Sequence, residues 1–330
     1  MVSEAAYRAA RTRVARIDRA DRARLFASGA DRASYLQGLL TNDIAALAAG
    51  RGCYAAYLTP QGRMISDLYV YELGDEILIV LPRQARTTVF DKLDRFIFTE
   101  DVAVRDATDA IAEIAIVGPR AAEVVSSLLD DVSVDRINAL PEHGNLTGGF
   151  EGTRAVITRV SDTGEPGFDV YVERTKASAM ESRLGAAGVV SVDPETSDAM
   201  RIEAGVPLFG RDMDEGTIPL EAGIEERAIS FTKGCYVGQE VIVRVLHRGH
   251  GRVARKLVGL TIDGDQVPAP GASVHAADRE AGRVTSSTMS PALKTPIALA
   301  YVQRDFVAVA TVLSVDGSRA IVTELPFVHE

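Results

Sequence analysis

Two glycines bracket a cysteine in the stretch "FTKGCYVGQE", residues 231–240. Lys233 precedes Cys235 by two residues, and "GQEVIVRVLHR" can form a helix, although its β-branched residues leave a strand open. If the segment is helical, the positive end of the helix and the Lys233 ammonium both favour the thiolate of Cys235. Such a thiolate is a candidate nucleophile or redox group. The alternative is an inert, buried cysteine in a glycine-bordered turn, because free cysteines are usually buried.

Three side chains upstream are candidates for binding a ligand. Ser66 and Asp67 are adjacent in "GRMISDLYV", which reads as a strand, so their side chains face opposite ways and at most one of them points into a given cavity. Glu203 in "RIEAG" falls near the end of a predicted helix, beside a loop rich in glycine and proline. A carboxylate there can accept hydrogen bonds from a flat heterocycle, but glutamates are also commonplace at helix ends.

The charge distribution favours small anions over nucleic acid as partners. The chain has 46 acidic and 36 basic side chains, a net charge of −10, which argues against broad binding of nucleic acid. Locally, no acidic residue lies between Glu240 and Asp263. That interval is either an anion-attracting stretch or a solvated linker, and its basic residues are Arg244, Arg248, Arg252, Arg255 and Lys256.

Other functional classes are excluded by composition. No apolar run approaches the roughly 20 residues of a membrane span, so we expect a cytoplasmic protein without membrane contact. The only cysteines, Cys53 and Cys235, cannot form a disulfide framework and lack metal-type CxxC spacing. An iron–sulfur cluster usually takes four cysteine ligands, so we expect no metal site formed by one chain alone.

The elements that must position these residues fall into two or three domains, as 330 residues suggest. A helix is predicted over 31–47, with Asp31 as its N-cap, followed by a hairpin through "TPQG". Residues 110–193 read strand–helix–strand–strand–helix–strand, which is the ferredoxin-like pattern. After residue 251, short β-rich runs separated by turn residues predict a small antiparallel barrel.

Several of these segments resemble one known family. "KGCYVGQE" is similar to the K-G-C-[FY]-x-G-Q-E signature of the YgfZ-type folate-binding proteins, relatives of the aminomethyltransferase (T-protein) of the glycine cleavage system. "SYLQGLLTNDI" and "LTPQGRMISDLYV" resemble N-terminal segments of that family. "RIEAGVPLFGRDMD", followed by "IPLEAG", resembles a segment that it shares with T-proteins.

The resemblance implies an α+β fold with three domains around a central funnel. These would be a discontinuous folate-binding domain (1–108 with 198–250), a ferredoxin-like domain (109–197) and a C-terminal antiparallel β-barrel (251–330). It further implies a cytoplasmic, monomeric protein that binds tetrahydrofolate and assists the assembly or repair of iron–sulfur clusters. Its partners would be iron–sulfur assembly factors or client [4Fe–4S] enzymes, including tRNA-modifying ones. The alternative is a folate-dependent aminomethyltransferase or demethylase of one-carbon metabolism.

The same resemblance assigns roles to individual residues. Cys235 and Lys233 would carry the chemistry. T-proteins usually have two adjacent aspartates in the hairpin, one acting on the folate; this chain has Ser66 and Asp67, and either is the possible counterpart. The residues expected to bind folate are Ser66, Asp67, Glu203, Tyr236, Gln239, Glu240 and Arg248.

Overall fold

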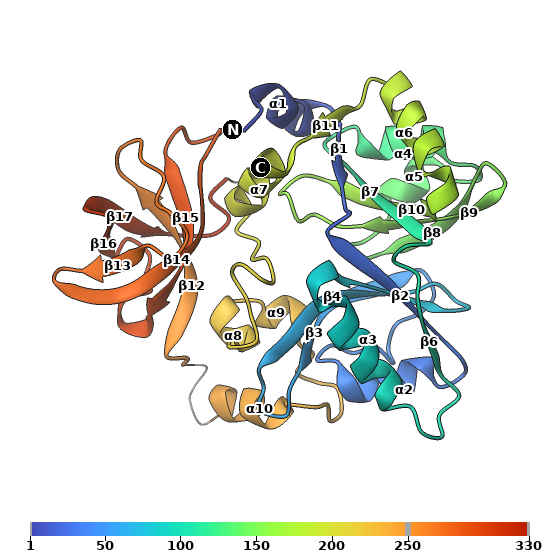
Figure 1. Ribbon diagram of the computed structural model, residues 1–330, viewed down its shortest axis with the longest axis horizontal. Helices are drawn as coiled ribbons and strands as arrows, with labels where there is room; N and C mark the ends of the chain where they lie inside the picture. The colour runs from blue at the N-terminus through green and yellow to red at the C-terminus, as the bar shows by residue number, and fades with distance from the viewer. Residues whose placement is uncertain (1, 248–251, 329–330) are drawn as a thin grey trace.

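The computed structural model describes residues 2–247 and 252–328. Figure 1 shows two sheets with their helices on one side of the molecule and a β-barrel on the other, with a helical linker between them. The longest helices of the described part have 10 residues, and none of its helices has the length and apolarity to cross a bilayer.

The first sheet has five antiparallel strands in the order β3-β4-β5-β2-β6. The strands are β2 (Arg22–Ser28), β3 (Arg51–Leu58), β4 (Met64–Glu72), β5 (Ile77–Pro82) and β6 (Ala103–Asp106). Two helices, α2 (Arg32–Leu39) and α3 (Arg86–Arg95), belong to this unit. β4 is buried at every position, as expected of a strand covered on both faces.

The predicted helix over 31–47 was wrong at its C-terminal end, whereas Asp31 does occupy the N-cap position. α2 ends at Leu39, because Leu40 adopts an extended backbone and pairs with Tyr57 of β3. The Asp31 side chain makes no capping hydrogen bond within the helix; instead it accepts from the backbone N–H of Asp101 at 2.9 Å. Tertiary contacts therefore set both ends of this helix.

The second sheet has six strands in the order β11-β1-β7-β10-β9-β8. They are β1 (Ala15–Asp18), β7 (Ile111–Val117), β8 (Asn145–Phe150), β9 (Thr153–Arg159), β10 (Gly167–Glu173) and β11 (Val190–Val192). With α4 (Ala121–Leu128), α5 (Val134–Asn138) and α6 (Ala177–Ala186), they confirm the ferredoxin-like arrangement. Two additions extend it: β1 inserts between β7 and β11, parallel to β11, and β8 joins the edge.

β1 and the preceding helix α1 (Glu4–Thr12) thus lie with the second sheet, although their sequence precedes the first. The chain crosses from one sheet to the other between β1 and β2 (Figure 1). Residues 19–22 therefore lie where the two sheets meet.

The C-terminal unit is a closed antiparallel barrel, in the order β12-β15-β14-β13-β16-β17, and the predicted barrel is confirmed. Its strands are β12 (Arg255–Ile262), β13 (Ser273–Ala276), β14 (Arg279–Met289), β15 (Pro296–Gln303), β16 (Val312–Val315) and β17 (Ser318–Thr323). β17 pairs with β12, so the ring of strands leaves no free edge.

The linker between sheets and barrel consists of short helices: α7 (Pro194–Glu203), α8 (Pro219–Ala222), α9 (Glu225–Ala228) and α10 (Gln239–His247). Asp193 caps α7 by accepting from the backbone N–H of Thr196 at 2.8 Å. The helix after Gly238 is confirmed, and the strand alternative for this segment was wrong. The described residues also contain the 3₁₀ turns η1 (Arg83–Ala85), η2 (Arg174–Lys176) and η3 (Arg304–Phe306).

Candidate functional site

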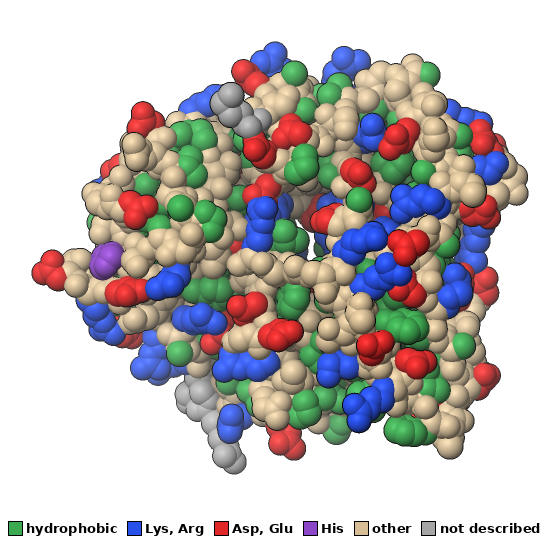
Figure 2. Space-filling model, viewed as in Figure 1, with side chains coloured by type: hydrophobic (Ala, Val, Ile, Leu, Met, Phe, Trp, Pro, Cys, Tyr) green, Lys and Arg blue, Asp and Glu red, His purple; other side chains and the backbone are tan. Residues whose placement is uncertain are grey.

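A cavity of about 630 Å³ lies where the two sheets meet the linker. Its wall is built from the crossover between β1 and β2, from neighbouring positions of β3 and β4, from α7 and from α9. Figure 2 shows the molecule hollowed near its centre. Cavities of this size are typical of sites for small organic ligands.

Asp67 is the carboxyl that the first sheet presents to this cavity. It shares a face of β4 with Tyr69, two residues on, and Tyr69 is paired with Tyr54 of β3, their ring centroids 5.1 Å apart. The Tyr54 hydroxyl donates to Asp67 Oδ2 at 2.8 Å, whereas Oδ1 is buried without a partner. That open oxygen can accept a hydrogen bond from a ligand.

The environment of Asp67 suits a group that exchanges protons. Burial raises the pKa of its carboxyl, while Arg22, Arg227 and the hydrogen bond from Tyr54 act in the opposite direction and only partly offset it. A carboxyl with a raised pKa in a cavity is a candidate general acid or base.

Ser66 lies on the other face of β4. Its side chain is fully buried, and its hydroxyl donates to the backbone oxygen of Asp67 at 2.6 Å. It is not among the residues that line the cavity. Of the two hairpin positions that the sequence left open, only Asp67 reaches the cavity.

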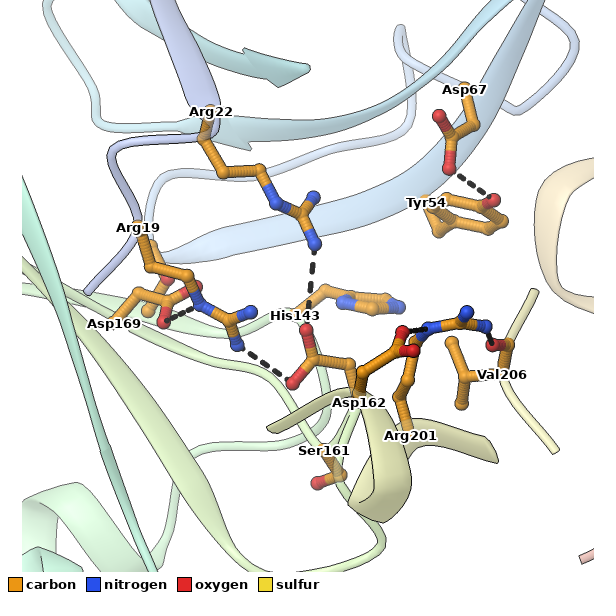
Figure 3. A network of polar contacts seen from close by, with 12 residues as sticks. Arg19, Arg22, Tyr54, Asp67, His143, Ser161, Asp162, Asp169, Arg201 and Val206 are labelled. Carbon is orange, nitrogen blue, oxygen red and sulfur yellow. Dashed lines mark hydrogen bonds and ion pairs between the residues drawn. The ribbon is translucent and has the colours of Figure 1, made fainter. Parts of the chain in front are cut away.

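Two arginines stack on the two tyrosines. The Arg22 guanidinium carbon lies 5.3 Å from the Tyr69 ring centroid, and that of Arg227 lies 5.2 Å from the Tyr54 ring centroid. Arg22 is also bonded to Asp162, as Figure 3 shows. Arg227, in contrast, forms no ion pair with a carboxylate within the described ranges, so it is available to an anionic ligand.

Arg227 also borders a second cavity, of about 510 Å³, on the barrel side. Val206 and Pro207 also line both cavities, so the second cavity adjoins the first on the side of the barrel. Of the basic stretch predicted from the sequence, Lys256 lines this second cavity and pairs with Glu225 at 3.7 Å.

Glu203 lies away from both cavities. It is fully buried at the end of α7, and its carboxylate accepts from Tyr7 and Arg11 of α1, each at 2.7 Å. From the barrel side, the Ser290 hydroxyl and the Ala292 backbone N–H donate to it at 2.5 and 3.1 Å. These donors occupy the carboxylate, which ties α1, α7 and the barrel together in this arrangement.

Lys233 fastens the end of α2. Its Nζ donates to the backbone oxygens of Gln37, Leu40 and Asn42 at 2.7, 2.6 and 2.8 Å. Burial lowers the pKa of this ammonium to about 8. The amine is thus aimed at backbone carbonyls, and the structure gives no contact between Lys233 and the thiol of Cys235.

The two thiols occupy different environments. Cys235 is exposed, so the alternative of a buried cysteine at this position was wrong. Cys53, half-buried on β3, has its pKa raised to about 12 by burial and stays protonated near neutral pH.

The remaining residues of the motif build the turn before α10. Tyr236 is buried, its ring centroid 5.1 Å from the Lys233 amine, and its backbone N–H donates to the Gln239 side chain at 3.3 Å. Gly238 has φ +85°, and a Cβ there would lie 2.5 Å from the Thr59 backbone oxygen, so only glycine fits. Glu240 is exposed, and Arg248 lies outside the described residues. None of the three described side chains lines the large cavity.

Sequence reasoning missed most of this cavity wall. The alternation of β4 already places Tyr69 beside Asp67, and that signal was available. Arg22, Asp162 and Arg227 come from three separate parts of the chain, and only the fold brings them together.

Comparison with known proteins agrees with the fold. The family model described as "GCVT N-terminal domain" matches residues 1–233, and the one described as "Glycine cleavage T-protein C-terminal barrel domain" matches residues 255–329. The chain is similar to proteins named aminomethyltransferase. The one from Rubrobacter xylanophilus is 33% identical over 91% of this chain and 78% of its own length. The one from Streptomyces coelicolor is 33% identical over 89% of this chain and 79% of its own length.

A solved structure has the same architecture. The glycine cleavage system aminomethyltransferase T from Bartonella henselae superposes with a TM-score of 0.85 and 24% sequence identity, covering 98% of this chain and 89% of that one. At this identity the match supports the fold.

Proposed function

The chain belongs to the glycine cleavage T-protein family, and from this we propose that it is a folate-dependent aminomethyltransferase. It would transfer the carbon of a lipoyl-bound aminomethyl group to tetrahydrofolate. The observation that supports this most strongly is the buried carboxyl of Asp67, whose Oδ1 has no partner and which lines the large cavity.

The role in iron–sulfur cluster assembly expected from the sequence was wrong. Relatives that align with about nine tenths of the chain are named aminomethyltransferase, and the resemblance to the YgfZ-type subfamily finds no support among them. Iron–sulfur assembly factors, client [4Fe–4S] enzymes and tRNA-modifying enzymes are therefore dropped as partners. The division into domains, the monomeric state and the cytoplasmic location stay proposals.

The cavity suits tetrahydrofolate in size and chemistry. Its volume of about 630 Å³ lies within the range of sites that enclose small organic ligands. The paired rings of Tyr54 and Tyr69 offer apolar surface to a flat heterocycle, and Asp67 Oδ1 can accept from a ring N–H. Arg227 lies between the two cavities and supplies positive charge for the carboxylates at the other end of such a molecule.

Asp67 would handle the protons of the transfer. In this reaction the aminomethyl carbon forms bonds to two tetrahydrofolate nitrogens while its bonds to sulfur and to its own nitrogen break, which yields a thiol, ammonium and methylenetetrahydrofolate. Each folate nitrogen must lose its proton as the new bond forms. An ionised Asp67 accepts one at Oδ1, and its raised pKa lets it pass that proton on to the leaving ammonia.

A transfer assay tests the proposal. Purified protein is incubated without iron, with tetrahydrofolate and an aminomethylated lipoyl donor, and methylenetetrahydrofolate and ammonia are quantified. We expect the two products in equal amounts, and neither when tetrahydrofolate or the donor is omitted. Absence of both products from folded protein that has bound tetrahydrofolate would contradict the proposal.

A further inference from the structure

A buried group of charges joins the two sheets at the crossover between β1 and β2. Asp162, in the loop between β9 and β10, accepts from Arg19 Nη2 at 2.7 Å through Oδ1 and from Arg22 Nη2 at 3.4 Å through Oδ2. Arg19 and Asp162 are buried, and all three residues line the large cavity. The Asp162 carboxylate thus comes from a loop of the second sheet, whereas Arg22 is the first residue of β2 in the first sheet (Figure 3).

Asp162 fixes the direction of the Arg22 side chain. With one Nη2 bond to Asp162, the guanidinium lies over the Tyr69 ring at 5.3 Å. Tyr69 and Asp67 share a face of β4, so the positive charge stands on the same side of the strand as the Asp67 carboxyl. Arg227 approaches from α9 but is exposed and has no carboxylate partner in the described part of the chain. Arg22 is therefore the anchored one of the two cations.

The Asp162 carboxyl stays ionised near neutral pH. Burial opposes ionisation of Asp162, but Arg19 and Arg22 outweigh it and lower the pKa of the carboxyl. Arg19 also pairs with Asp169 of β10 at 3.5 Å, and the buried Glu113 carboxyl of β7 interacts with Arg19 and Arg22. Around Asp67 the facing groups are Tyr54 from β3, Tyr69 from β4, Arg22 from β2 and Arg227 from α9.

We propose that Asp162 is a positioning residue for the transfer site: it holds the Arg22 guanidinium against Tyr69, where a fixed positive charge keeps Asp67 ionised and ready to accept a proton. The inference rests on the proposed function. It also implies that the site is complete only when the two sheets are docked, because the anchor and the acceptor belong to different sheets.

The variant Asp162→Asn tests this. It keeps the size of the side chain and one acceptor but removes the charge that anchors Arg22. In the transfer assay we expect the acid limb of the kcat/KM profile to move to higher pH by about one unit. At a given pH on that limb, kcat/KM should therefore be about tenfold lower than in wild type. The rate should recover at higher pH, where Asp67 is ionised again. A defect of structure alone would lower the rate equally at every pH.

Matched variants separate positioning from packing. Glu72→Gln alters another buried carboxylate, Glu72, which pairs with Arg32 at 3.0 Å and does not line the cavity. It should lower the melting temperature and leave the acid limb in place. Asp162→Glu, which retains the charge, should stay nearer the wild-type profile than Asp162→Asn. If Asp162→Asn does not fold, Arg22→Gln removes the anchored guanidinium itself and should shift the acid limb in the same direction.

A second measurement needs no turnover. The pKa of Asp67 is read from carboxyl ¹³C chemical shifts in wild type and in Asp162→Asn, and we expect it to be about one unit higher in the variant. Equal values in the two folded proteins would overturn the inference. An inactive wild type with the expected shift would instead contradict the proposed function and leave the positioning role standing.

Discussion

Replacement of Asp67 by asparagine should remove catalysis and leave the fold intact. The amide has almost the size of the carboxyl, and its oxygen can still accept from the Tyr54 hydroxyl that now donates at 2.8 Å. Because burial raises the pKa of Asp67, ionising it in the folded protein is unfavourable, and the neutral amide avoids this cost. We expect the free energy of unfolding to change by no more than about 1 kcal/mol, the net value of a typical hydrogen bond.

The effect on rate should be much larger. A positioned acid or base contributes roughly 10²- to 10⁴-fold, so we expect kcat of Asp67→Asn to fall at least about 100-fold. In wild type, activity should be present above the pKa of Asp67 and be lost as the pH falls through it. Burial places this acid limb above the usual carboxyl range, and the variant should lack it.

The assay follows methylenetetrahydrofolate across a pH series, with urea unfolding of the same preparations. Ser66→Ala is the matched control, since its side chain lies on the opposite face of β4 and outside the cavity. It should retain the wild-type rate and the acid limb. If kcat of Asp67→Asn lies within threefold of the wild-type value and the acid limb is unchanged, the role assigned to this carboxyl is refuted.

Three further outcomes follow from the contacts. Lys233→Met should lower the free energy of unfolding by about 3 kcal/mol, because three backbone oxygens lose a charged donor; urea titration measures this, and a loss below about 1 kcal/mol would contradict it. Glu203→Gln should lower the free energy of unfolding by about 3 kcal/mol, because it breaks a buried ion pair with Arg11; an unchanged melting curve would contradict this. Cys235→Ala should leave the transfer rate unchanged, and alkylation of wild type should label the exposed Cys235 before Cys53, whose pKa burial raises to about 12; a strong loss of rate would restore the thiol as a candidate.

The parts of the fold that depend on local alternation were predictable. The barrel strands and the ferredoxin-like order follow from period-two patterns and turn residues, which need no long-range information. The end of α2 was not predictable in this way, because Leu40 leaves the helix to pair with Tyr57. The insertion of β1 beside β11 is likewise a contact between segments far apart in sequence.

The residues of the candidate site likewise differ in how far local sequence could predict them. Asp67 was within reach of sequence reasoning because strand alternation limits the cavity side to one residue of the Ser66–Asp67 pair. The surroundings of Glu203 could not be predicted, because a position at a helix end does not say which partners surround the carboxylate. Arg22 and Asp162 are 140 residues apart, and only the meeting of two sheets makes them neighbours. The motif around Cys235 indicated chemistry, which stays a prediction; in the structure, Lys233 and Gly238 of this motif stabilise a turn.

We propose that the cavity around Asp67 binds tetrahydrofolate. A crystal structure of the protein with bound tetrahydrofolate tests it most directly. We predict the bicyclic ring inside the cavity, with a ring nitrogen about 3 Å from the Asp67 carboxylate, the distance of a hydrogen bond. Tetrahydrofolate bound elsewhere, with Asp67 still partnered only by Tyr54, would contradict it.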